Sequence, residues 1–217
     1  MTPTPLDNTS VYQGQFGEFT INDRDRQEVI FYRAGLSVAA LCFGLGSSIV
    51  LWQGHQLAPW VPLLNGLYAL FGLALGLSLW LIHIYMKPLH RALQLFWAIG
   101  LGASIAIAHF DPAPFVVTVY RQPFSLLGVG FLFAALTGIF FKEAFCFNRL
   151  ETKLLTPLVP VLLLGHLVGW LSVTTEQWLL GIWAILFLIF AARKIVQPIP
   201  PDIGDKSVFT YLEQQHS

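Results

Sequence analysis

Few ionisable residues fall inside the long apolar stretches of this chain, so those few are the first candidates for chemistry. Charged or titratable groups are costly inside a bilayer and are retained there mainly for function. His166 is the only ionisable side chain clearly within an apolar run. A neutral imidazole can ligate a haem iron or a chlorophyll magnesium, which makes His166 the candidate cofactor-binding residue. The alternative is a hydrogen bond from His166 to a neighbouring helix.

Two other histidines are expected on the same side of the membrane as His166. His55 and His109 follow apolar runs that end there, and Asp111 lies close to His109 in sequence. Whether His55, His109 and His166 converge on a zinc ion stays open, because only the topology brings them together. No HxxxH or HxxEH spacing occurs, so the sequence predicts no metal site.

The charged groups on the opposite side are expected to face solvent or lipid headgroups. His83 and His90 flank a basic connection, where headgroup contact is the expected role. Glu143 closes an apolar run, and we expect it to pair with Lys142 or Arg149. None of these residues needs a further function to explain its presence.

Motifs for enzymatic chemistry are absent from the sequence. It has no HExxH, no phosphate-binding loop and no histidine on the last apolar run that could serve a membrane-embedded serine. We therefore expect a protein that is not an enzyme and has no catalytic residue. The substrate-binding residues are unknown, although a solute path beside His166 and Asn65 is an alternative interpretation.

The composition explains why so little chemistry is available. The chain has 217 residues, of which 55% are hydrophobic and 11% charged, whereas soluble proteins carry about 25% charged residues. Its 12 basic residues are balanced by 12 acidic ones, which leaves no electrostatic footprint for nucleic acid. Two cysteines do not make a disulfide framework. The lipid bilayer is therefore the first expected partner, and nucleic acid is not one.

Six stretches are long and apolar enough to cross a membrane, which takes roughly 20 residues. They are Ala34–Trp52, Val61–Ile84, Ala92–Ala108, Phe124–Phe141, Leu154–Leu171 and Trp178–Ala192. Eleven of the 12 Lys and Arg then fall on one face, and Arg121 alone lies on the other. Lys and Arg near span ends stay cytoplasmic. The predicted fold is an all-α, polytopic bundle of six transmembrane helices with both termini cytoplasmic.

Small residues spaced four apart are expected to bring these helices into close contact, because little hydrophobic drive exists between helices in lipid. The rows are Ala40, Gly44 and Ser48; Gly72 and Gly76; Ala98, Gly102 and Ala106; Gly130, Ala134 and Gly138; and Gly165 and Gly169. The last span has no such row, so we expect it on the lipid-facing periphery. The same rows could instead dock a partner subunit, and the sequence leaves both uses open.

The chain divides into a cytoplasmic N-terminal segment (1–32), a transmembrane domain (33–195) and a cytoplasmic C-terminal tail (196–217). Residues 1–10 are expected to be mobile, and Gln197–Ser217 to be loosely ordered. The glycines and aromatic residues of Val11–Ile21 predict a short hairpin or extended segment. Asn22 or Asp23 can then cap the helix that follows.

One connection on the outer side is unusually apolar. His109–Pro123 contains Asp111, two prolines and the run Phe115–Tyr120. It is too short to cross the membrane and too apolar to extend into water. An interfacial or re-entrant segment packed over the bundle is expected.

The string Val11-Tyr-Gln-Gly-Gln-Phe-Gly-Glu-Phe-Thr-Ile21, the acidic-arginine stretch Asp23–Arg26 and the six spans together resemble a known family. It is an uncharacterised family of integral membrane proteins, a domain of unknown function found in cyanobacteria and photosynthetic eukaryotes. The resemblance covers about residues 10–200. It implies no catalytic residues, but it does imply a photosynthetic host and hence a thylakoid or plasma membrane.

Three functional hypotheses follow. The favoured one is a non-enzymatic accessory or assembly factor, or a small subunit, of a photosynthetic membrane complex, with other subunits of that complex as partners. The second is a carrier or channel for a small solute. The third is a haem- or chlorophyll-binding protein that uses His166, and the first two require no cofactor.

Overall fold

The structure, a computed structural model, describes residues 10–54 and 56–215. His55 and most of the predicted mobile tail lie outside these residues. Six helices in the described part are long and apolar enough to span a membrane, which confirms the predicted architecture. They are α1 (Asp23–Gln53), α2 (Val61–Leu81), α3 (Lys87–Phe110), α5 (Leu126–Phe147), α6 (Leu150–Leu167) and α7 (Val173–Val196).

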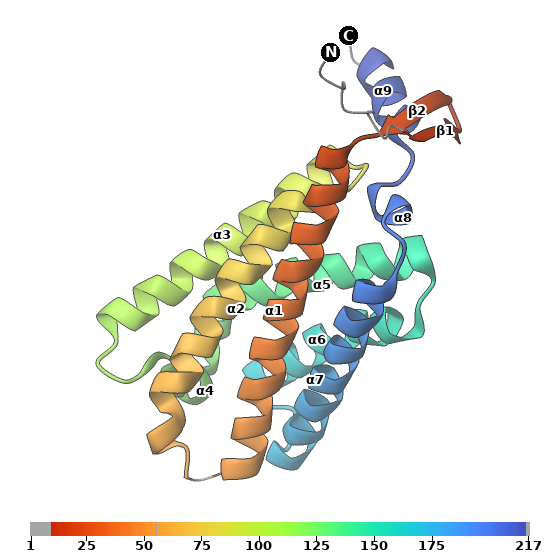
Figure 1. Ribbon diagram of the computed structural model, residues 1–217. Coiled ribbons are helices and arrows are strands. Elements are labelled where there is room, and N and C mark those ends of the chain that lie inside the picture. Colours follow the sequence, from red (N-terminus) through yellow and green to blue (C-terminus); the bar gives the residue numbers. More distant parts are fainter. Residues whose placement is uncertain (1–9, 55, 216–217) are drawn as a thin grey trace, which may run out of the picture.

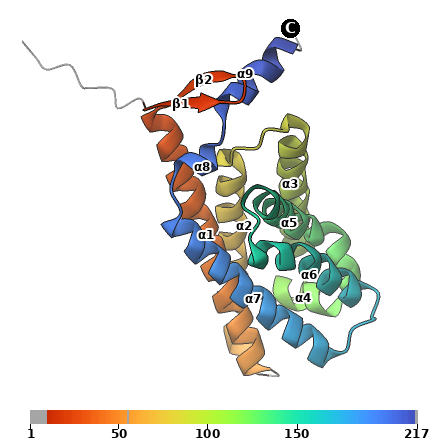
Figure 2. The ribbon, with the colours of Figure 1, turned by 90° about the vertical axis from the view of Figure 1, so that its right-hand side faces the viewer.

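The six spans form a ring in which each span packs on the next one in sequence, and the last span, α7, closes the ring on the first, α1 (Figures 1 and 2). Going round the ring, α2 packs on α1, α1 on α7, α7 on α6, α6 on α5 and α5 on α3. The last contact, between α3 and α2, is slight although the two helices follow each other in the chain. The ring is therefore weakest beside α3, which has the smallest buried share of the six spans.

The position of the last span differs from the prediction. Helix α7 packs between α1 and α6 and is as buried as α5 and α6 are, so it is not set apart at the periphery, although its outer face is exposed. Its Trp183, Phe187 and Phe190 are almost completely buried. Large side chains fill the space between helices as well as small ones do, provided that the facing helix offers a recess. Gly44 of α1 supplies one, because a Cβ there would meet Leu188.

The small-residue row predicted for the third span also faces elsewhere. Ala98, Gly102 and Ala106 are exposed, and a Cβ at Gly102 would meet nothing within 4 Å. Helix α3 instead approaches α5 through Gly100, where a Cβ would collide with the backbone of Leu132. The sequence offers small residues on both faces of α3, and the tertiary fold uses only one of them.

The glycine pair of α2 accommodates an aromatic ring. A Cβ at Gly76 would collide with the indole of Trp97 on α3, and Trp97 Nε1 donates a hydrogen bond to the Gly72 carbonyl at 2.8 Å. The pair thus makes a slot for one side chain. This contact links α2 to α3, and a hydrogen bond of 2.7 Å between the Tyr68 and Ser104 hydroxyls is a second link.

The fifth span has the predicted length of 18 residues but begins and ends four residues earlier than predicted, and Gly169 sets its end. This glycine has φ of +66°, and its N–H and that of Trp170 donate to carbonyls of the last helical turn. Glycine adopts this left-handed conformation without the strain that a Cβ would add. Gly169 is therefore a helix terminator and does not belong to a packing row with Gly165.

The N-terminal strands and the C-terminal helices of the described chain lie together at one end of the bundle, which we call the terminal end (Figure 1). Strands β1 (Ser10–Gly14) and β2 (Gly17–Ile21) form an antiparallel hairpin, as predicted, and Asn22 caps α1 through a capping box with Asp25. The C-terminal segment is ordered, contrary to the prediction. It forms α8 (Pro200–Ile203) and α9 (Lys206–Gln215), and α9 packs on the hairpin.

The apolar outer connection packs against the bundle, as predicted. It forms the short helix α4 (Phe115–Arg121), and short 3-10 turns, η1 (Ala58–Trp60) and η2 (Pro123–Ser125), precede α2 and α5. Phe115 is buried against Tyr68, with ring centroids 4.6 Å apart. Asn65 of α2 accepts a hydrogen bond from the Val116 N–H at 3.2 Å, which accounts for this polar residue inside a span.

Candidate functional site

Lys194, near the end of α7, is buried at the terminal end together with two carboxylates. Its Nζ lies 2.6 Å from Glu143 Oε2 on α5 and also donates to Asp202 Oδ1 on α8. The three side chains are each 2% exposed or less. A charge buried without its partner costs several kcal/mol, so each of these groups depends on the others.

Arg33, ten residues after the start of α1, binds the same carboxylate from the other side. Its Nε and Nη2 donate to Asp202 Oδ2 at 2.8 and 2.7 Å. Its Nη1 donates to the Gln197 carbonyl at 2.5 Å and Nη2 to the Pro198 carbonyl at 2.8 Å. The guanidinium therefore ties the start of the first span to the segment that follows the last one.

Two further groups bind Glu143 Oε1. Tyr32 donates its hydroxyl proton to this oxygen at 3.1 Å, and Lys142 Nζ lies 3.0 Å away. The pairing of Glu143 with Lys142 was predicted, whereas Arg149 donates to the Gln197 side chain instead. We call these six residues the terminal charge cluster: Tyr32, Arg33, Lys142, Glu143, Lys194 and Asp202.

The terminal charge cluster is saturated by its own members. Each oxygen of Glu143 and of Asp202 accepts at least one hydrogen bond from within the chain. The aromatic faces of Phe147 and Tyr32 lie 4.2 and 5.8 Å from Lys194 Nζ and favour its charge further. These contacts make the cluster a clamp between α1, α5, α7 and α8.

Glu151, at the start of α6, differs from the clamp residues. Its Oε2 pairs with Arg193 at 3.1 Å. Its Oε1 is buried and has no hydrogen-bond partner among the described residues.

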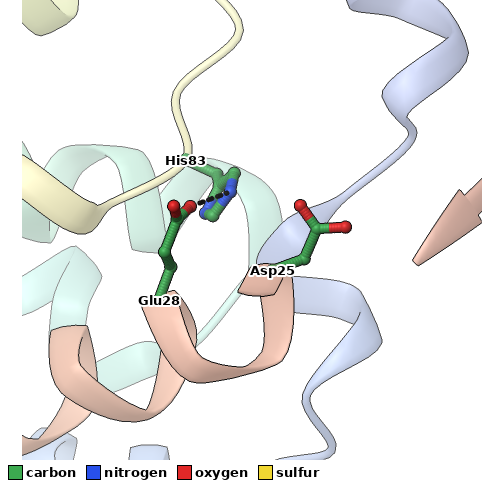
Figure 3. Close-up of side chains that lie close together, drawn as sticks. All are labelled: Asp25, Glu28 and His83. Carbon is green, nitrogen blue, oxygen red and sulfur yellow. Dashed lines mark ion pairs between the residues drawn. The ribbon is translucent and has the colours of Figure 1, made fainter. Parts of the chain in front are cut away.

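A second group of polar side chains lies at the terminal end, outside the clamp (Figure 3). Asp25 and Glu28 belong to the first turns of α1, and His83 comes from the connection between α2 and α3. One ligand atom from each of the three lies within 4.8 Å of the other two. We call Asp25, Glu28 and His83 the acid–histidine triad.

His83 is fixed in place by its neighbours in sequence. Ile82 and Ile84 on either side are buried, and His83 Nε2 lies 3.5 Å from Glu28 Oε2. Burial lowers the pKa of His83, while Glu28 and Asp25 oppose that shift. The imidazole is thus favoured in the neutral form that can bind a metal. Headgroup contact, the predicted role, does not describe this arrangement.

The carboxylates of the acid–histidine triad have other partners too. Asp25 Oδ2 accepts from the Asn22 N–H at 2.9 Å and from Lys206 Nζ at 2.8 Å. Glu28 Oε1 accepts from Arg24 Nε at 3.0 Å, but Arg24 is 87% exposed, so this pair is weak.

His166, the candidate cofactor ligand, pairs with the start of the next helix. Its Nδ1 lies 2.8 Å from Glu176 Oε1, and its ring stacks on Tyr120 with centroids 5.6 Å apart. This is the predicted alternative of a hydrogen bond to a neighbouring helix. A carboxylate on one ring nitrogen also orients the other for ligation, and no hydrogen bond to Nε2 is found among the described residues.

The other histidines of the prediction do not join His166. His109 is exposed and packs edge-on against Phe110, while Asp111 accepts from the Ala113 N–H and from the Gln122 side chain, both in the same outer connection. Within residues 10–54 and 56–215, potential metal ligands gather in a group of three or more at the acid–histidine triad. His90 lies 2.6 Å from the Leu79 carbonyl and has a structural role.

Aromatic side chains fill the centre of the bundle between the terminal charge cluster and His166. Phe43 packs on Trp183 with centroids 4.3 Å apart, and Phe133 packs on both Phe71 and Trp183 at 5.7 and 5.4 Å. These rings come from α1, α2, α5 and α7. Two open hollows lie near the opposite end, and the one lined by Ile107, Thr118 and Gln122 among others measures about 400 Å³.

Comparison with known proteins gives one match. Residues 77–211 match the family model of DUF2301, described as an uncharacterized integral membrane protein. The match covers more than half of the chain. The chain belongs to this family. No curated protein and no solved structure matches it.

The part that matches DUF2301 does not include the N-terminal string on which the resemblance was based. It begins within α2, so it contains His83 and the clamp residues Glu143, Lys194 and Asp202. Arg33 and the two carboxylates of the acid–histidine triad precede it. Membership of DUF2301 establishes an integral membrane protein and assigns no activity to any residue.

Neither the terminal charge cluster nor the acid–histidine triad was predicted from the sequence. Lys194 was counted among the charges after the last span, and Asp202 lies in a segment read as a tail. The one feature of the sequence that could have indicated the cluster is Glu143, an acidic residue that follows an apolar run almost directly. The triad could not be recognised in the sequence, because His83 lies far from Asp25 and Glu28 in the chain.

Proposed function

We propose that this integral membrane protein is a non-enzymatic accessory or assembly subunit of a membrane complex. The observation that carries the proposal is the exposed row of Ala98, Gly102 and Ala106 on α3. Around it, the outward positions of α3 carry large side chains such as Leu95, Ile99 and Ile105. A row of small residues leaves a gap in this surface, and the gap does not improve the contact of α3 with lipid.

The partner that fits this row is a transmembrane helix of another subunit. Helices approach closely in lipid where small residues line the contact, and α3 already uses this mode on its other face, where Gly100 meets the backbone of Leu132. A glycine inside a helix costs about 1 kcal/mol relative to alanine. An incoming helix would recover that cost at Gly102.

The internal chemistry supports the same proposal. The carboxylates of the terminal charge cluster are occupied by partners within the chain, and aromatic rings fill the centre of the bundle. Those rings separate His166 and Asn65 from the clamp, which weighs against a solute carrier. The finer proposal, a photosynthetic complex in a thylakoid or plasma membrane, rests on the resemblance alone.

Purification from mildly solubilised native membranes tests the proposal. The tagged wild-type protein should bring down a stoichiometric membrane partner, and Gly102→Leu should lose it while its thermal stability is unchanged. Gly66→Leu is the matched control, because Gly66 is also an exposed helical glycine at which an added Cβ would meet nothing within 4 Å, but it lies on α2. A monodisperse wild-type protein without partners, or equal recovery with all three proteins, would refute the proposal.

A second candidate function is pigment or haem binding at His166. The pairing of Nδ1 with Glu176 favours it, because that contact fixes the ring and leaves the Nε2 lone pair to coordinate a metal. An absorption spectrum of the purified protein decides it. A Soret or chlorophyll band that disappears in His166→Ala supports ligation, and a colourless wild-type protein from its native membrane excludes it.

A further inference from the structure

The acid–histidine triad brings together three metal-ligand side chains from two distant parts of the chain. One imidazole and two carboxylates meet at the junction of α1 with the connection between α2 and α3 (Figure 3). The sequence predicts no metal site, and membership of DUF2301 assigns none. We propose that Asp25, Glu28 and His83 bind a divalent transition-metal ion.

The ligand types select the class of ion. Imidazole nitrogen suits zinc, iron, copper and nickel, while carboxylates suit harder ions such as manganese and magnesium. A mixed set of one nitrogen and two oxygens fits a borderline ion such as Zn²⁺, whose structural and catalytic sites use His and Asp or Glu. Three protein ligands leave a fourth position for water.

The distances allow such an ion with a small adjustment. Zinc ligands at about 2.1 Å from a tetrahedral ion lie about 3.4 Å from one another. The ligand atoms of the triad lie within 4.8 Å of one another, and His83 Nε2 is already 3.5 Å from Glu28 Oε2. Closure therefore requires a movement of about 1 Å, which rotation of the Asp25 and Glu28 side chains supplies.

The backbone under the triad is held in place before an ion arrives. The capping box with Asn22 fixes the first turn of α1, and buried Ile82 and Ile84 anchor the connection that carries His83. Asp25 is 8% exposed, and no hydrogen bond to its Oδ1 is found among the described residues. An ion would therefore bind groups that are already close and partly dehydrated.

Lys206 is the natural competitor of the ion. Its Nζ lies 2.8 Å from Asp25 Oδ2 and neutralises one of the two carboxylates. The exposed Arg24 leaves the charge of Glu28 largely uncompensated. A cation on the triad would complete the neutralisation, but it would also be repelled by Lys206.

Isothermal titration calorimetry of Zn²⁺ into tag-free, chelator-treated protein in detergent tests the site. We expect one saturable ion per chain, and at least tenfold weaker binding in His83→Ala and in Glu28→Gln, since even residues behind a metal ligand contribute 10- to 100-fold. His109→Ala, which removes an exposed histidine at the opposite end, should bind as the wild type does. Asp25 is left unchanged because it caps α1.

Lys206→Met sharpens the test. It removes the competing charge, so Zn²⁺ should bind this variant more tightly than the wild type, and its thermal midpoint should rise further when the ion is added. Absence of saturable binding in both proteins overturns the proposal. So does binding that His83→Ala and Glu28→Gln leave unchanged while both variants retain the wild-type thermal midpoint without metal.

Discussion

Lys194 Nζ and Glu143 Oε2 lie 2.6 Å apart in a part of the bundle from which solvent is almost completely excluded. The two residues belong to α7 and α5, which are not adjacent in the ring of helices. Their pairing therefore crosses the bundle, and Asp202 extends it to the C-terminal segment.

Lys194→Met should destabilise the protein by about 3 kcal/mol, since removing one partner of a buried ion pair leaves the other charge uncompensated. The double variant Glu143→Gln/Lys194→Met should lose less than the two single variants together. Denaturant titration in detergent micelles measures both. Arg24→Ala, which breaks an exposed pair, is the control and should cost under about 0.5 kcal/mol. A fully stable Lys194→Met would show that the clamp contributes nothing.

Two glycines on α3 should respond in opposite ways to the same substitution. Gly100→Leu should destabilise the bundle by at least about 1–3 kcal/mol, because its side chain would enter the Leu132 backbone, which cannot move aside. Gly102→Leu should leave the isolated protein as stable as the wild type, since its Cβ meets nothing within 4 Å. Thermal unfolding in detergent compares them, and equal losses would contradict the position assigned to α3.

The attachment of the hairpin to the C-terminal segment should depend on Asp205. Its Oδ2 accepts from the Gln15 N–H at 2.6 Å, and Oδ1 accepts from the Ser207 N–H and hydroxyl. Asp205→Asn keeps one acceptor oxygen but loses the charge, so hydrogen exchange at Gln15 should become severalfold faster. Glu18→Gln, which affects a contact within the hairpin, should leave Gln15 protected.

The same attachment should weaken in acid. Slight burial raises the pKa of Asp205, but the hydrogen bonds from Ser207 and Gln15 outweigh it and the pKa is lowered overall. A lowered pKa means that the folded state favours the carboxylate. The stabilisation is therefore present above the ordinary Asp pKa of about 3.9 and is lost as the pH falls through and below that value. Hairpin contacts followed by NMR between pH 6 and 3 should show this loss, and Asp205→Asn should abolish the dependence.

Reporter tags on the two ends should be accessible from the same side of the membrane. The hairpin and α9 lie together, and eleven of the 12 Lys and Arg side chains support a cytoplasmic location. Protease protection in oriented vesicles provides the measurement. Opposite accessibility of the two tags would be incompatible with six membrane crossings.

The spans could be predicted from sequence because burial in lipid demands a long apolar run in each helix. Their pairing could not, since in lipid both faces of a helix are apolar. On α3 the row at Gly102 and the position of Gly100 look equally suitable, and only the fit to Leu132 distinguishes them. For the same reason α7 was predicted to lie at the periphery, although Trp183 and Phe187 of this helix are almost completely buried.

The polar sites were predictable only where their partners lie close in sequence. His166 and Glu176 are ten residues apart, and a hydrogen bond from His166 to a neighbouring helix was expected. Arg33 and Asp202 are 169 residues apart. Charges near span ends are usually solvated, so nothing local indicates that these two meet in the protein interior.

The contacts of Arg33 also impose an order on biosynthesis. Its guanidinium leaves the ribosome with the first helix, whereas its acceptors belong to Gln197, Pro198 and Asp202. Throughout insertion, the growing bundle therefore carries a cation at the lipid boundary that has no counterion of its own. A chain that stops short of Gln197 would leave this guanidinium without any of these acceptors.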